Sequence, residues 1–92
     1  MSDIVSPVHH NVVTVLTTAT QMTTTARPLK RGMLLKAGSG NAVSIFIGGP
    51  NVTTATGFPL AANEGVLWPT QAQELVYAIC ASGSPTVAWA AG

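Results

Sequence analysis

The sequence predicts a small all-β protein: a single-domain β-sandwich or jelly-roll-like β-barrel with an extended N-terminal arm. About eight short β-like segments follow one another at intervals of roughly 8–12 residues, with turn signals between them. Apolar residues alternate with period two inside several segments, and no 3.6-residue period appears. The chain has 92 residues, which suits one domain.

The N-terminal residues differ in pattern from the rest. Residues 1–10 are expected to form a flexible arm, because Pro7 and the pair His9-His10 follow a polar start without periodicity. Residues 11–92 are expected to form the sandwich or barrel domain.

The first two strands are expected at residues 11–18 and 20–25. The first (NVVTVLTT) is β-branched and suits a pleated surface. The second (TQMTTT) would place threonine hydroxyl groups on one face and methyl groups on the other. Pro28 ends this stretch, since it has no N–H to give to a ladder.

The third strand is expected at residues 32–37 (GMLLKA). Period-two alternation puts Met33 and Leu35 on one face and Leu34 and Lys36 on the other. A glycine-rich turn follows, since two glycines within four residues permit tight backbone angles.

The central strand is expected at residues 42–47 (AVSIFI), the most strand-like run in the chain. Residues 52–54 are expected to form a short edge strand. Residues 57–60 (GFPL) are expected to be a loop with two apolar anchors, because Pro59 interrupts them.

Three strands complete the domain, at residues 66–68, 74–80 and 86–90. In the last of these, Val87 and Trp89 are expected to share a face.

Composition limits the classes of function. Only 8% of residues are charged, against about 25% in a typical soluble domain, so part of the surface is expected to lie against other chains or to be covered by polar uncharged residues. The net charge of +1 argues against nucleic-acid binding through a basic face. No apolar run approaches the ~18 residues of a membrane span, and no secretory signal is visible, so synthesis in a reducing cytoplasm is expected.

Residues with chemical potential are few. An enzyme or metal protein would have to be built around His9, His10, Cys80 and Glu64. Cys80 ends an apolar strand, where a free cysteine behaves as a small buried hydrophobe. We therefore expect no enzyme activity, no cofactor and no metal site.

Six residues are candidates for contact with a partner. Three are cations around Pro28, which either clamp an acidic patch or only solvate the module, and three are aromatic, the type that dominates interface hot spots. They are Arg27, Lys30, Arg31, Phe58, Trp68 and Trp89.

The segment from Arg31 to Gly92 resembles short proteins encoded in the structural gene clusters of tailed phages. The resemblance rests on Ile45-Phe46-Ile47-Gly48-Gly49, Asn51-Val52-Thr53, Gly57-Phe58-Pro59-Leu60 and Leu75-Val76-Tyr77-Ala78-Ile79, in that order. It implies a virion structural protein on the phage head surface, a decoration or cement protein, often trimeric, that binds the major capsid protein at subunit junctions. Residues 1–30 carry no part of the resemblance. The alternative is a head-fibre, tail or baseplate module that acts as an adaptor or binds a receptor.

Overall fold

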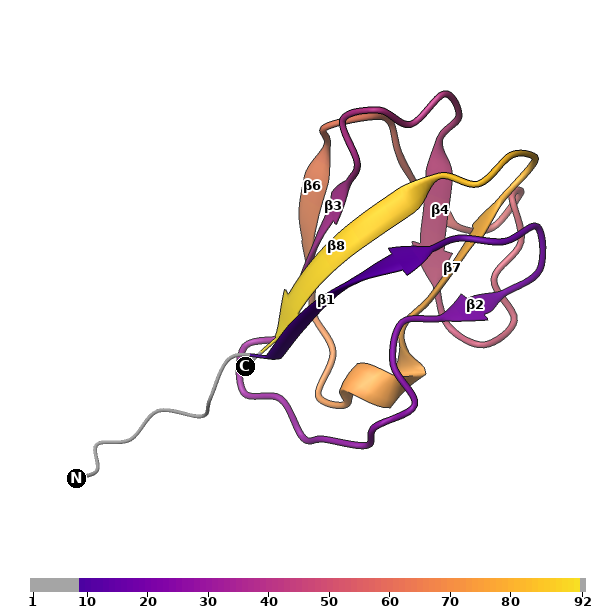
Figure 1. Cartoon of the computed structure of the whole chain (residues 1–92). Helices are drawn as coiled ribbons and strands as arrows, with labels where there is room; N and C mark the ends of the chain where they lie inside the picture. Colours follow the sequence, from indigo (N-terminus) through magenta and orange to yellow (C-terminus); the bar gives the residue numbers. More distant parts are fainter. Residues whose placement is uncertain (1–8, 92) are drawn as a thin grey trace.

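The protein folds into two four-stranded antiparallel sheets, which confirms the predicted all-β class (Figure 1). This computed structural model describes residues 9–91. Sheet A contains β1 (His9–Thr14), β8 (Thr86–Ala91), β3 (Met33–Ala37) and β6 (Gly65–Trp68), in this order. Sheet B contains β2 (Thr20–Gln21), β7 (Tyr77–Cys80), β4 (Ile45–Gly48) and β5 (Phe58–Leu60), in this order.

The two sheets share one apolar core, which makes the fold a sandwich. Alternation within the strands selects its residues: Met33 and Leu35 of β3 are buried, and so are Ile45 and Ile47 of β4. Burying one such side chain stabilises the fold by about 1.5–3 kcal/mol. Trp89 lies in the same core, on the inner face of β8 beside Val87, as the alternation predicted.

Two long connections cross between the sheets at the same end of the sandwich. Residues 22–32 lead from β2 to β3, and residues 69–76 lead from β6 to β7 and include the short 3-10 helix η1 (Gln73–Leu75) (Figure 1). A bridge joins Pro28 to Ala72, and the Leu29 amide donates to the Gln71 carbonyl over 2.7 Å. These bonds tie the two connections together and close this end of the core.

Gln73 anchors the same crossing from inside. Its side chain is buried, and its Nε2 donates to the Thr25 carbonyl over 2.9 Å. Its Oε1 is buried and has no hydrogen-bond partner within residues 9–91. A buried amide with one satisfied end fixes the connection at a cost, because an unpaired buried acceptor is unfavourable.

A glycine makes the entry into β3 possible. Gly32 has a φ of +99°, and a Cβ at this position would lie 2.3 Å from the Trp68 carbonyl oxygen. Only a residue without a side chain fits both the backbone angle and the close approach.

Several strand boundaries differ from the prediction. The strands expected at 11–18, 20–25, 42–47 and 74–80 are shorter, and the last begins only at Tyr77 because η1 takes up the residues before it. The edge strand expected at 52–54 was wrong, since this segment is coil and turn with Val52 buried. The loop expected at 57–60 was also wrong. Phe58–Leu60 is β5, and Pro59 is tolerated there because β5 is an edge strand.

The expected arm was wrong at its end, because His9 and His10 do not belong to it. β1 begins at His9, and both His9 and His10 pair with β8, so they belong to the domain. The rest of the expected arm, residues 1–8, lies outside the described residues.

Candidate functional site

The outer faces of the two sheets are covered differently. On sheet B, the loop 49–57 folds back over Phe46: a Cβ on Gly57 would lie 2.5 Å from the Cβ of Phe46. Val52 of this loop is buried, and Ile79, which pairs with Phe46, is buried too. Around Phe46, sheet B therefore covers part of its outer face with its own chain.

The outer face of sheet A is open instead. Pairing within the sheet places at its centre a set of residues here called the sheet A outer face: His10, Val12, Leu34, Lys36, Leu67, Ala88 and Ala90. Val12 is 62% exposed, Leu34 53% and Leu67 58%, so large apolar side chains face solvent on three of the four strands of the sheet.

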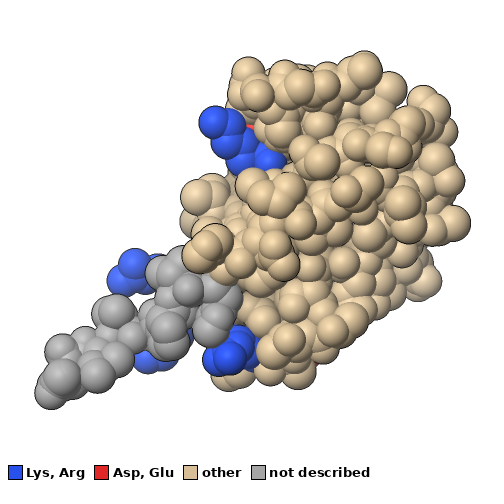
Figure 2. All heavy atoms as spheres, viewed as in Figure 1, with Lys and Arg blue, Asp and Glu red and all other residues tan. Residues whose placement is uncertain are grey.

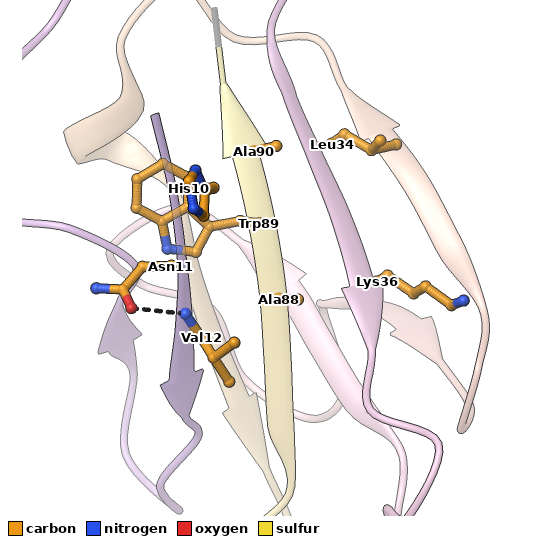
Figure 3. Close-up of a pocket in the computed structure, with 8 residues that line it drawn as sticks. All are labelled: His10, Asn11, Val12, Leu34, Lys36, Ala88, Trp89 and Ala90. Carbon is orange, nitrogen blue, oxygen red and sulfur yellow. Dashed lines mark hydrogen bonds between the residues drawn. The ribbon is translucent and has the colours of Figure 1, made fainter. Parts of the chain in front are cut away.

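The centre of the sheet A outer face is a shallow groove. Ala88 and Ala90 of the central strand β8 form its floor, because alanine leaves room that the larger side chains of the flanking strands do not fill. Val12 stands on one side and Leu34 and Lys36 stand on the other (Figure 3). The groove has a volume of about 460 Å³.

Charge is sparse around this surface. Lys36 is the one formally charged residue of the sheet A outer face. Figure 2 shows the Lys and Arg side chains along one side of the molecule, while much of the visible face carries no charged group. A largely apolar face with a single charged residue suits a protein partner better than a polyanion.

The three predicted cations lie on the connection between β2 and β3, and all are exposed. Arg27 holds its place through its backbone, whose amide donates to Glu74 Oε1 over 3.3 Å. Lys30 and Arg31 immediately precede Gly32 at the start of β3. They flank the sheet A outer face and do not form it.

The three predicted aromatic residues separate into two groups. Phe58 is half-exposed and contacts the half-buried Trp68 edge to face, with ring centroids 6.2 Å apart, so this pair is available at the β5–β6 side of the sandwich. Trp89 is only 6% exposed and belongs to the core, so it has almost no surface to offer a partner.

The sequence prediction missed the sheet A outer face as a unit. The sequence did contain a signal for this surface, because Leu34, Leu67 and the alanines of β8 put apolar residues at outward positions as well as at inward ones. A strand that is apolar on both faces indicates that both faces are covered. Without the pairing order of the strands, however, these residues could not be placed on one surface.

The residues considered for catalysis or metal binding are not brought together. Cys80 is buried, as expected, with its Sγ 3.5 Å from the Val15 carbonyl oxygen. Within residues 9–91, no three His, Cys, Asp or Glu side chains are grouped so that they could hold a metal ion. In the same part of the chain, no helix has the length and hydropathy needed to cross a bilayer.

Comparison of the chain with protein-family models, with curated proteins and with solved structures finds no match in any of the three.

Proposed function

We propose that this chain is a non-catalytic structural protein that docks on a larger protein assembly through the sheet A outer face. The single observation that carries the proposal is the exposure of Val12, Leu34 and Leu67 around an alanine-floored groove, on a sheet whose counterpart covers part of its own outer face. Contiguous exposed apolar surface on a small domain marks an interaction site.

The assembly that we propose is a phage head, on which the chain acts as a decoration or cement protein bound to the major capsid protein. The resemblance of residues 31–92 to phage structural proteins supports this choice. The size of the surface supports it too: three half-exposed large apolar side chains around two alanines make a small contact beside the ~800 Å² per partner of a standard interface. A contact this small gains strength when copies bound at neighbouring lattice positions are joined, because each then raises the effective concentration of the next.

The exposed aromatic pair Phe58–Trp68 favours a second candidate, a fibre, tail or baseplate module that binds a receptor. Accessible aromatic side chains in an edge-to-face pair at the side of a sandwich suit a ligand with flat apolar faces, such as a sugar ring.

The test is co-sedimentation of the purified chain with assembled, undecorated heads of the phage that encodes it, with free capsid monomers as the control. Saturable binding to assembled heads and not to free monomers, with the same number of copies at each equivalent lattice position, supports a decoration protein. Binding to tails or fibres and not to heads would replace it with the second candidate.

A further inference from the structure

The edge strand β1 offers a second surface, distinct from the sheet A outer face. Each sheet has two edge strands, and three of the four are poor templates for pairing. β2 has two residues, β5 has three and includes Pro59, and β6 has four and is followed by Pro69. β1 has six residues, His9–Thr14, without a proline or a formal charge. Natural proteins usually protect an edge strand by keeping it short or by placing a proline or a charged residue in it.

The hydrogen-bond pattern shows which backbone amides of β1 point away from β8. The Val15 amide donates to the Pro85 carbonyl over 2.8 Å, which continues the β1–β8 register by one pair. Amides of an antiparallel strand point alternately toward and away from its neighbour. Val13 and Asn11 therefore bond to β8, and the amides of His10, Val12 and Thr14 point away from the sheet.

One of these outward amides already donates a hydrogen bond to a neighbouring side chain. The Val12 amide donates to Asn11 Oδ1 over 2.8 Å (Figure 3). This bond joins adjacent residues at an exposed site, so a carbonyl from another strand can replace it at little cost. Asn11 therefore competes with any strand that pairs with this edge.

We propose that two copies of the chain pair through β1, antiparallel and two-fold symmetric, with Val12 at the centre. In this register Val12 faces Val12 of the second copy, and His10 faces Thr14 of the second copy. All three outward amides and their carbonyls are then used, giving about six backbone hydrogen bonds. A valine pair stabilises an antiparallel contact, and no like charges meet. The free edge of β1 is thus complementary to the same edge of a second copy, so a second copy is the partner that fits it.

This pairing joins two copies of sheet A into one continuous sheet. The two sheet A outer faces then lie side by side and double the exposed apolar surface that one partner can contact. A two-fold contact closes at two copies, in contrast to the trimer that the phage resemblance implies. The inference does not depend on the proposed function.

The test is the mass of the full chain in solution, measured by sedimentation equilibrium without any other protein. We expect the mass to rise with concentration to twice the 9.4 kDa chain mass and to stop there. A mass of one chain up to about 1 mM, or a mass of three chains, would overturn the inference.

Substitutions at the adjacent residues Asn11 and Val12 should change the dissociation constant of the dimer in opposite directions. Asn11→Ala frees the Val12 amide and should tighten the dimer several-fold. Val12→Lys sets two like charges opposite each other and should weaken it at least about tenfold. Leu75→Lys is the matched control, because Leu75 is also exposed but lies on η1, and it should leave the dimer constant unchanged. A weaker dimer from Asn11→Ala, or an equal effect of Leu75→Lys and Val12→Lys, contradicts pairing through β1. Circular dichroism of each variant separates loss of pairing from loss of fold.

Discussion

Truncation of two adjacent leucines tests the assignment of the two faces of β3. Leu35 is fully buried in the core, whereas Leu34 is 53% exposed on the sheet A outer face. The two substitutions, Leu35→Ala and Leu34→Ala, remove the same atoms from the same strand. Their effects on the free energy of unfolding should therefore differ only because the two side chains have different surroundings.

The magnitudes follow from burial. Leu35→Ala leaves a cavity between the sheets, and changes of this kind cost about 3 kcal/mol or more. A domain of this size has a total stability of about 5–14 kcal/mol, so the loss is a large part of it and should lower Tm by about 12–24 °C. Leu34→Ala removes a side chain that is already half in water, and it should cost at most about 1 kcal/mol.

The assay is urea unfolding followed by circular dichroism at a fixed protein concentration, with a thermal melt of each variant. Leu35→Met is the control, since it keeps most of the volume and should cost less than about 1.5 kcal/mol. Equal losses from Leu34→Ala and Leu35→Ala would show that Leu34 is covered in the free protein. A small loss from both would refute the register of β3.

Three further predictions concern single side chains. Gly32→Ala should destabilise the fold by about 2 kcal/mol or more, because its Cβ would meet a backbone carbonyl at positive φ. Gly40→Ala has open space around it and should change stability by less than about 0.5 kcal/mol. Equal effects of the two substitutions in a urea titration would contradict this difference. Asn41→Ala should cost about 1–2 kcal/mol in the same titration, because the Asn41 side chain accepts from the Thr86 amide over 2.9 Å and donates to its carbonyl over 2.8 Å; an unchanged midpoint would mean that water replaces both bonds. Cys80 is buried and should react with a thiol reagent only when the chain unfolds, so complete labelling within minutes in native buffer would show that the end of β7 opens.

Much of the fold could be predicted because the local signals agreed with the tertiary structure. The alternation in residues 32–37 and 86–90 correctly placed Met33 with Leu35, and Val87 with Trp89, on the same face of a strand. The position of β4 also followed from its apolar run, although β4 begins at Ile45. In each case a strand with two different faces could be interpreted from its sequence alone.

The errors arose where local preference and tertiary position disagreed. Pro59 argues against a strand, but an edge strand needs only one of its two hydrogen-bonding sides, so β5 forms. Val52-Thr53-Thr54 looks like a strand, yet Val52 is drawn into the covering of sheet B, and Thr53 turns the chain through hydroxyl–backbone bonds.

The functional surface was the least predictable feature. The six candidate residues were chosen by type, and the aromatic character that suggested an interface role for Trp89 serves the core instead. The sheet A outer face depends on which strands are neighbours, and strand order is a property of long-range pairing. Only the pairing of β1 and β3 with β8 brings Val12 and Leu34 to opposite sides of the same groove.

The most direct test of the central claim is the affinity of two leucine variants for assembled phage heads, measured by co-sedimentation. Leu34 and Leu75 are equally exposed, at 53%, but only Leu34 lies on the sheet A outer face. The account predicts that Leu34→Ser weakens binding at least about tenfold, the loss expected for one apolar anchor, while Leu75→Ser binds as the unchanged chain does. Equal binding by both variants, with both correctly folded, would contradict docking through the sheet A outer face.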